Sequence, residues 1–270
     1  DLYSIENLAR VDVICLDKTG TITEGVMEVK NIIPYKNNKK SKVKELLSNY
    51  VNALDDPSPT FKSIENYVTN ELHDYETLET LPFSSIRKYS GVKFKEGVYF
   101  LGSPENLLKK PLKELSTYQK DYRVLLLASG ESLKKIDNLK PIAYILIQDK
   151  IKENASDTLN YFKNEGVDIK IISGDNPITV SKIAERVGYT DIRAIDMSTV
   201  ENENISDVIE NYNILGRVKP EQKKLIIMAL QEKKHFVAMT GDGVNDCLAL
   251  KQADCSIAMA SGSEAAKNVS

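Results

Sequence analysis

One stretch near the amino end constrains the fold of this chain more than any other. Residues 11–16 are apolar apart from Asp12, and they lead directly to Asp17 and a turn of glycine and hydroxyl residues, Thr19-Gly20-Thr21. A strand buried inside a parallel sheet reads as such an apolar run, and the carboxyl ends of parallel strands carry the reactive groups. The stretch therefore predicts a buried strand that presents Asp17 at the functional edge of an α/β sheet.

Strands and helices alternate in the second half of the chain. Strands are expected at residues 142–147, 168–172, 192–195, 235–239 and 256–260, and helices at residues 154–165, 177–187, from 220 onward and at 245–252. Such alternation predicts a parallel sheet covered by helices on both faces. The strand that ends at Asp17 belongs to the same sheet.

The region from residue 30 to residue 140 follows a different pattern. Residues 91–95 and 98–101 flank the turn Glu96-Gly97, which predicts a β-hairpin, and a further strand is expected at residues 123–128. Helices are expected at residues 1–10, 61–73 and 104–121, and a basic surface loop at residues 36–44 is expected to lead into a further helix. The predicted architecture is a Rossmann-like α/β domain of residues 1–29 and 141–270. An α+β domain of residues 30–140, with an antiparallel sheet, is inserted into it.

Composition excludes several classes of protein. The formal net charge is −3, so no broad cationic surface is available for nucleic acid or anionic lipid, and tryptophan is absent. The three cysteines lack the paired spacing of a zinc site. No apolar run approaches the roughly 18 residues that a membrane helix requires. We therefore expect a soluble cytoplasmic region without a nucleic-acid partner, and the start at Asp1 instead of methionine suggests a piece of a longer protein.

Three of the predicted strands end in turns that contain aspartate and glycine. These turns hold Asp17, Ser173-Gly174-Asp175, and the run from Thr240 to Asp246, while Lys223 lies just after a helix start. Carboxylates beside glycine turns and helix starts are typical of a site for a metal ion and a phosphate. The repulsion between an attacking carboxylate and a polyphosphate is about 4 kcal/mol per charge pair at ~4 Å. Mg²⁺ and a lysine would remove that barrier, so Asp17 is predicted to attack a phosphoryl group.

At these residues the sequence resembles the P-type ATPases, which are cation pumps. Residues 17–23 resemble the phosphorylation signature of that family, and Ser173-Gly174-Asp175 resembles its second signature, with serine in place of threonine. Residues 218–224 resemble the segment of its catalytic lysine, and residues 239–259 its hinge signature. The resemblance covers the whole chain and is to the bacterial, non-heavy-metal type. It implies a haloacid-dehalogenase-like phosphorylation domain with an inserted nucleotide-binding domain.

The resemblance also implies a role for each matching residue of the first domain. Asp17 would form an aspartyl phosphate, and Mg²⁺ would be coordinated by Asp17, Asp242 and the carbonyl oxygen of Thr19. Asn245 and Asp246 would support the metal ligands. The phosphoryl group would be surrounded by Lys223, Thr21, Ser173 and Gly174, and the nucleotide would be contacted by Asp175, Lys152 and Arg217.

The inserted domain matches the family in three segments. Residues 83–92 resemble the segment whose phenylalanine stacks on adenine, which nominates Phe83 and Lys88. Residues 101–105 resemble the next signature, including Gly102, but Leu101 replaces its leading lysine. Arg123 matches an arginine that reaches toward the phosphates. Because a charge-assisted contact contributes roughly 1.5–3 kcal/mol, we expect weak ATP binding that Leu101→Lys would improve.

Three functions are compatible with these motifs. The first is the catalytic cytoplasmic portion of a multi-pass, ATP-driven pump for calcium or another small cation, here a monomer without the actuator and transmembrane domains and incomplete for turnover. The second is a phosphatase of the haloacid dehalogenase superfamily. Those enzymes usually carry a second aspartate two residues after the nucleophile, where this chain has Thr19, which cannot relay a proton as a carboxylate does. The third is a non-catalytic nucleotide-binding regulatory module, against which the intact set of Asp17, Lys223 and Asp242 argues.

Overall fold

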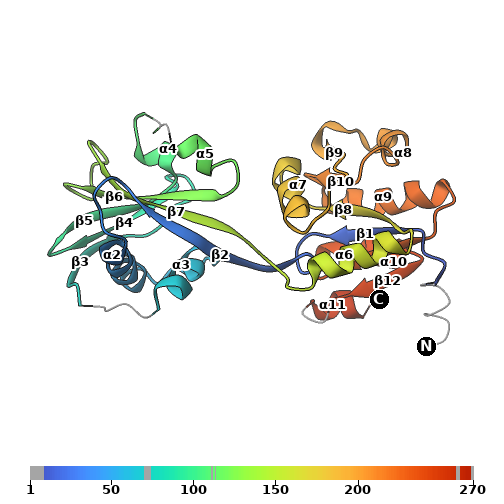
Figure 1. Ribbon diagram of the computed structural model, residues 1–270, viewed down its shortest axis with the longest axis horizontal. Coiled ribbons are helices and arrows are strands. Elements are labelled where there is room, and N and C mark those ends of the chain that lie inside the picture. Colours follow the sequence, from blue (N-terminus) through green and yellow to red (C-terminus); the bar gives the residue numbers. More distant parts are fainter. Residues whose placement is uncertain (1–8, 70–73, 111, 113, 260–261, 269–270) are drawn as a thin grey trace. The chain divides into compact units, whose positions relative to one another are not determined.

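The chain forms two compact units, each built on its own sheet (Figure 1). The computed structural model describes residues 9–69, 74–110, 112, 114–259 and 262–268, so most of the helix predicted at residues 1–10 lies outside the described residues. Unit 1 comprises Asp1–Gly25 and Lys150–Ser270, and unit 2 comprises Val26–Asp149. The domain boundaries proposed from the sequence fall inside two long strands, β2 (Thr23–Pro34) and β7 (Lys140–Ile151).

Unit 1 contains a six-stranded sheet in the order β12-β11-β1-β8-β10-β9. Its strands are β12 (Cys255–Ala258), β11 (Val237–Gly241), β1 (Val13–Asp17), β8 (Asp168–Ile172), β10 (Ile214–Gly216) and β9 (Ala194–Asp196). Every neighbouring pair in this order is parallel, which confirms the parallel sheet predicted from the sequence. All five residues of β1 are buried between two neighbouring strands.

Helices cover both faces of this sheet. They are α6 (Ala155–Asn164), α7 (Pro177–Arg186), α8 (Ile205–Val208), α9 (Pro220–Glu232), α10 (Cys247–Gln252) and α11 (Glu264–Lys267), with short 3₁₀ turns η1 (Met197–Thr199), η2 (Asn202–Asn204) and η3 (Val244–Asp246). Val13 and Cys15 pack in one apolar cluster with α9, whereas Ile14 and Leu16 pack in another with α6 and α7. Because strand side chains alternate between faces, Asp17 is directed to the α9 side.

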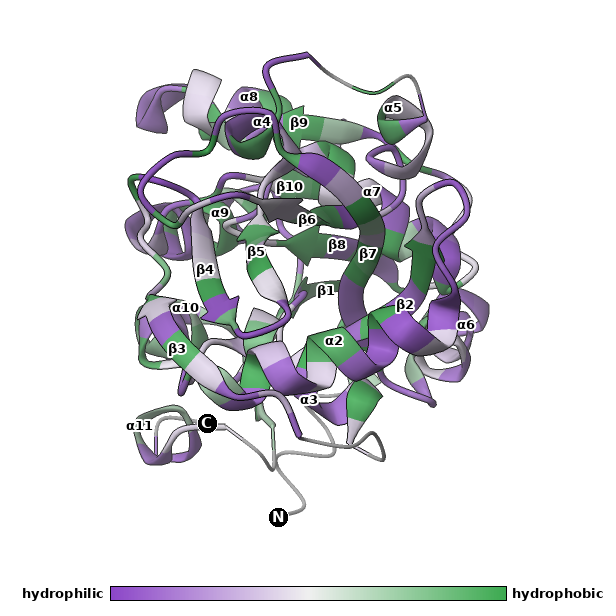
Figure 2. Cartoon of the chain, turned by 90° about the vertical axis from the view of Figure 1, so that its left-hand side faces the viewer, coloured by the Kyte–Doolittle hydropathy of each residue, from purple (hydrophilic) through white to green (hydrophobic). Residues whose placement is uncertain are grey.

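Unit 2 contains a second six-stranded sheet, in the order β2-β7-β6-β5-β4-β3. The remaining strands are β3 (Thr77–Leu81), β4 (Tyr89–Phe94), β5 (Gly97–Gly102) and β6 (Arg123–Gly130), and the helices are α2 (Lys40–Ala53), α3 (Pro59–Val68), α4 (Pro104–Leu107) and α5 (Leu115–Tyr118). The pairs from β3 to β7 are antiparallel, as predicted. In Figure 2 hydrophilic and hydrophobic segments alternate along α2, which buries Val43, Leu46 and Leu47.

Three predictions about the elements were wrong. The strand at residues 142–147 lies in β7 of the unit 2 sheet and not in the parallel sheet. Its residues alternate between two apolar clusters, Ala143 and Ile145 in one, Tyr144 and Leu146 in the other. A strand covered on both faces reads as a continuous apolar run whatever the direction of its neighbours, so the run could not identify the sheet.

The predicted helix at residues 104–121 is instead two short helices, α4 and α5. The chain leaves the helical conformation at Leu108, and the sequence has a proline at position 111, which disfavours helical backbone at the residue before it. The third wrong prediction is the end of the basic loop at residue 44, because the helix that follows it, α2, already begins at Lys40. Among the residues that the structure describes, every helix is too short or too polar to cross a lipid bilayer.

Candidate functional site

The carboxyl end of β1 places Asp17 opposite a lysine of α9. Asp17 is 7% exposed, and its Oδ2 accepts a hydrogen bond of 3.0 Å from Lys223 Nζ. The backbone N–H of Asp17 donates to Thr240 Oγ1 at the end of β11, at 3.2 Å. Pro220 occupies the first turn of α9, a position that proline favours, so Lys223 follows within the first turns of the helix. Two distant parts of the sequence therefore meet at a buried ion pair.

The same ammonium group also contacts Asp246, at the start of α10. Lys223 Nζ lies 2.6 Å from Asp246 Oδ1, and Asp246 Oδ2 accepts the backbone N–H groups of Asp242 and Gly243 at 3.2 and 3.1 Å. Both oxygens of Asp246 are thus engaged. This carboxylate holds the lysine and the glycine-rich turn after β11 in one arrangement.

Asp242 completes what we call the charged cluster, which consists of Asp17, Lys223, Asp242 and Asp246. The three carboxylates each offer an oxygen within 4.8 Å of the others. Gly20 allows this approach, because its φ is +76° and a Cβ atom there would lie 2.0 Å from Asp242 Oδ2. The glycine of the turn after Asp17 is therefore required by the position of a carboxylate from β11.

The electrostatics of the cluster show a shortage of positive charge. Burial, reinforced by Asp246 and opposed by Lys223, raises the pKa of Asp17 to about 7. Burial also raises the pKa of Asp242, with Asp246 adding to the effect. For Lys223 burial lowers the pKa, but the attraction of Asp17 and Asp246 outweighs it and the pKa is raised. Three carboxylates facing one ammonium group are a donor set that suits a hard divalent cation such as Mg²⁺.

Other residues predicted for this site lie at the same ends of the parallel strands. The Thr21 and Thr240 hydroxyl groups are 3.1 Å apart. Ser173 is buried at the end of β8, and its Oγ accepts the backbone N–H of Asp175 at 3.1 Å, across Gly174. The Asp175 carboxylate is paired with Lys18 Nζ at 2.7 Å. The sequence motifs did not assign a role to Lys18 or Thr240, since their partners depend on which strands are neighbours.

The remaining predicted residues of unit 1 are not hydrogen-bonded to the charged cluster in the interactions described. Arg217 has a φ of +51°, and its guanidinium binds Asp196 Oδ2 at 2.7 Å. The charge of Lys152 weakly opposes the rise in the pKa of Asp242, which brings Lys152 into the surroundings of the cluster. Thr19 and Asn245 are exposed in their turns.

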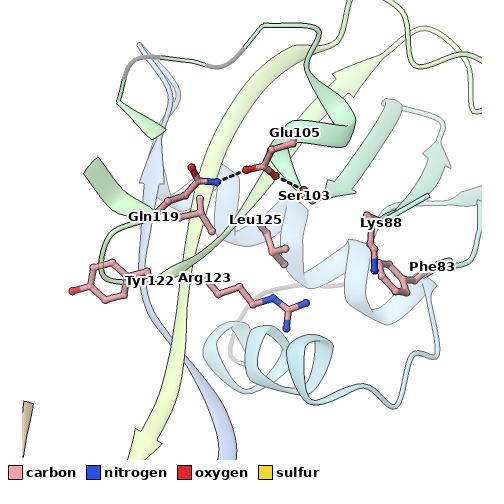
Figure 3. Close-up of a pocket in the computed structure, with 9 residues that line it drawn as sticks. Phe83, Lys88, Ser103, Glu105, Gln119, Tyr122, Arg123 and Leu125 are labelled. Atoms are coloured by element: carbon pink, nitrogen blue, oxygen red, sulfur yellow. Dashed lines mark hydrogen bonds between the residues drawn. The ribbon is translucent and has the colours of Figure 1, made fainter. Parts of the chain in front are cut away.

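Unit 2 has a pocket of about 360 Å³, which we call the large pocket. Three predicted nucleotide-binding residues line it, Phe83, Lys88 and Arg123. Figure 3 shows Phe83 and Lys88 together at one side, with the Arg123 side chain extending toward the middle. Phe83 is 45% exposed, so its ring is available to a planar ligand. The other lining residues are Ser103, Glu105, Gln119, Tyr122, Val124 and Leu125.

Gly102 shapes the loop that carries Lys88. Gly102 pairs with Tyr89, and a Cβ atom at Gly102 would lie 2.5 Å from the carbonyl oxygen of Lys88. Lys88 itself has a φ of +64°, and its carbonyl accepts the Ser103 N–H at 3.0 Å. Gly102 therefore permits close contact between two backbone segments, and it also lines a smaller cavity of about 90 Å³ beside Phe83.

Leu101 and Glu105 of unit 2 differ from what was expected from the motifs. Leu101 is 1% exposed and packs in an apolar cluster with Val92 and Phe94. A lysine there would bury an ammonium group at a cost in stability, so Leu101→Lys does not isolate a missing contact with ATP. Glu105, which the motif analysis did not name as a site residue, lies in the large pocket and is hydrogen-bonded by Ser103 and Gln119 (Figure 3).

Comparison with known proteins places this geometry in context. A family model described as haloacid dehalogenase-like hydrolase matches residues 11–254. The chain is 41% identical to the probable cation-transporting ATPase exp7 of Streptococcus pneumoniae, over 100% of this chain and 36% of that protein. It is 36% identical to the calcium-transporting ATPase CtpE of Mycobacterium tuberculosis, over 100% of this chain and 35% of that protein.

A solved structure of a zinc-transporting PIB-type ATPase in the E2.Pi state has the same fold, with a TM-score of 0.78 and 21% identity. That likeness covers 99% of this chain and 39% of the other. The chain therefore spans about a third of the length of the curated relatives that it matches.

Proposed function

Because the chain belongs to the haloacid dehalogenase-like hydrolase family, we propose that it is the catalytic portion of an ATP-driven cation pump in which Asp17 accepts the γ-phosphoryl group of ATP. The observation that carries this proposal is the bridge from Lys223 to both Asp17 and Asp246, with Asp242 beside them. The names of the relatives support cation transport, which in them belongs to proteins about three times as long. A position on the cytoplasmic side of a membrane and a small cation as cargo are part of the same proposal.

In the proposed reaction a carboxylate oxygen of Asp17 forms a bond to the γ-phosphorus. The bond from that phosphorus to the β,γ-bridging oxygen breaks, and ADP leaves with the electron pair. Lys223 favours the ionised form of Asp17 against the effect of burial, and it faces the charge that develops on the phosphoryl oxygens. The Thr21 and Ser173 hydroxyl groups would donate hydrogen bonds to the same oxygens. Asp17, Asp242 and the Thr19 carbonyl oxygen would hold Mg²⁺, whose charge would offset the repulsion between nucleophile and polyphosphate.

The aspartyl phosphate should be long-lived in this chain. Its hydrolysis needs a general base near the phosphorus, and position 19 offers a hydroxyl group in place of a carboxylate. Asp246 is a poor substitute because Lys223 and two backbone N–H groups already occupy both of its oxygens. This difference favours a pump, which stores the phosphoenzyme, over a phosphatase.

We assign the nucleotide to the large pocket of unit 2. The adenine ring would stack on the exposed face of Phe83, with Lys88 alongside, and Arg123 would face the anionic part of ATP. The pocket volume of about 360 Å³ suits a small-molecule ligand.

The proposal is tested by incubating the chain with Mg²⁺ and ATP labelled on the γ-phosphate. We expect covalent label that hydroxylamine releases and that Asp17→Asn abolishes. Asp12→Asn is the matched control, because Asp12 is half-exposed and precedes the same strand at its opposite end. We expect this variant to be labelled like the wild type. A chain that binds ATP without any label is a nucleotide-binding module, and rapid release of inorganic phosphate from the labelled chain would identify a phosphatase.

A further inference from the structure

Lys18, the residue after Asp17, has a buried charged side chain. The side chain is 7% exposed, and its ammonium group lies 2.7 Å from Asp175 Oδ2. The backbone of Lys18 is held as well, because its N–H donates to Ile172 O at 3.1 Å and its carbonyl accepts the N–H groups of Ile22 and Thr23 at 3.0 Å. A buried ammonium group is costly unless it is paired, so the pairing with Asp175 fixes where this charge lies.

Asp175 stands at the same edge of the sheet as the nucleophile. Asp17 is in register with Ile172, three residues before Asp175. The Asp175 side chain is 48% exposed, so its carboxylate faces both Lys18 and solvent. Its backbone is fixed by Ser173 Oγ and by the Arg217 N–H at 2.7 Å, whereas the Arg217 guanidinium is bound to Asp196. The arrangement thus holds a half-exposed carboxylate near the place where an anionic substrate must approach.

We propose that Lys18 is a positioning residue that neutralises and fixes Asp175, so that a polyphosphate reaches Asp17 without meeting an uncompensated carboxylate. The inference rests on the proposed function for the identity of the substrate. Removing the charge of Lys18 should weaken binding of the anionic substrate, and the size of this effect should depend on the charge of Asp175. Lys18 acts on substrate affinity through its pairing with that carboxylate.

A double-mutant cycle tests this dependence. The ATP concentration that gives half-maximal labelling is measured for the wild type, Lys18→Met, Asp175→Asn and the double variant, with the melting temperature of each. We expect Lys18→Met to raise that concentration about tenfold in the wild-type background and less than about twofold in the Asp175→Asn background. Lys18→Arg, which keeps the charge, should stay within about threefold of wild type. Lys233→Met is the control, since it removes a lysine paired with Glu210 at 3.1 Å elsewhere in unit 1.

An equal effect of Lys18→Met in both backgrounds overturns the inference. So does a fall in maximal labelling with the half-maximal ATP concentration unchanged, which would indicate a structural role. The same cycle is also read on the Kd of an ATP analogue with a β,γ-methylene bridge. If the wild type binds the analogue but takes up no label from ATP, the proposed phosphoryl transfer is wrong. The Kd values of the four variants would still decide the role of Lys18.

Discussion

The charged cluster of unit 1 and the large pocket of unit 2 are built in opposite ways. In the cluster, Asp17, Lys223 and Asp246 are buried, and Lys223 is hydrogen-bonded to both carboxylates. In the large pocket, Phe83 is 45% exposed, and the exposed Arg123 side chain extends toward the middle of the lining residues (Figure 3). Buried charges interact strongly because the local dielectric is low, whereas exposed groups gain most of their interactions only when a ligand arrives.

This contrast follows from where the side chains are carried. The cluster lies at the ends of central parallel strands, whose register is fixed by packing on both faces. The large pocket is lined by a loop between β3 and β4, by short helices and by the start of β6. Changes in the cluster should therefore alter the chemical step, whereas changes in the pocket should alter affinity alone.

The largest effect is expected from Gly20→Ala. The added Cβ atom would lie 2.0 Å from Asp242 Oδ2, so Asp242 must leave its place beside Asp17. We expect the rate of labelling to fall by about a hundredfold and the Mg²⁺ concentration required to rise, since positioning errors near 1 Å cost about that much. A titration of labelling rate against Mg²⁺ measures both quantities.

Gly25→Ala is the matched control for that change. Gly25 has nearly the same φ, +75° against +76°, but a Cβ atom there meets only Thr19 Cγ2 at the ordinary distance of 3.7 Å. Both variants place an alanine at a positive φ that L residues rarely adopt. Equal loss of labelling in the two would mean that strain, and not the position of Asp242, explains the effect of Gly20→Ala.

A smaller effect is expected from Phe83→Ala. Stacking of a base on an aromatic ring contributes about 1–3 kcal/mol, so the Kd for ATP should rise by about tenfold, measured by titration calorimetry. Labelling by acetyl phosphate, a phosphoryl donor without a base, should stay unchanged. Ile86→Ala is the control, since Ile86 belongs to the same loop and is 89% exposed. A loss of labelling with acetyl phosphate would show that the pocket and the cluster are not separable.

The sequence predicted the cluster well, for a physical reason. Asp17, Asp242 and Lys223 stand beside glycines and a proline that mark strand ends and a helix start, and parallel strands bring such ends together. The bond from the Asp17 N–H to Thr240 and the pair of Lys18 with Asp175 were not predicted. They depend on which strands are neighbours, and local pattern does not contain that information.

The large pocket was predicted less completely. Phe83, Lys88 and Arg123 line it, as the resemblance suggested, although their roles stay predictions. Glu105 and Gln119 were missed because they come from the segment that was assigned to one continuous helix. In that segment helix α4 ends before Leu108, and this interruption of the helix determines which side chains face the pocket. Helical periodicity alone does not reveal such a break.

The smallest effect concerns stability without Mg²⁺. The pKa of Asp17, raised to about 7 mainly by burial, exceeds its usual value of 3.8. At a pH between these two pKa values, Asp17 keeps its proton in the folded chain but has lost it in the unfolded chain. The stability that this group contributes therefore falls as the pH rises from about 4 to about 7. Asp17→Asn removes this penalty, and we expect it to raise the melting temperature at pH 8 by about 2–4 °C, with little change at pH 4.5.

Two comparisons make that expectation specific to the cluster. Asp12→Asn is the first comparison, because it makes the same substitution at a half-exposed residue beside the other end of β1, outside the cluster. Mg²⁺ should stabilise the wild type more than Asp17→Asn, because an ion that binds the folded state raises its stability by mass action. If instead Asp17→Asn melts below the wild type at pH 8 without Mg²⁺, the attraction of Lys223 exceeds the cost of burial. The cluster would then be assembled for stability as well as for chemistry, and its contrast with the open pocket would lie in exposure alone.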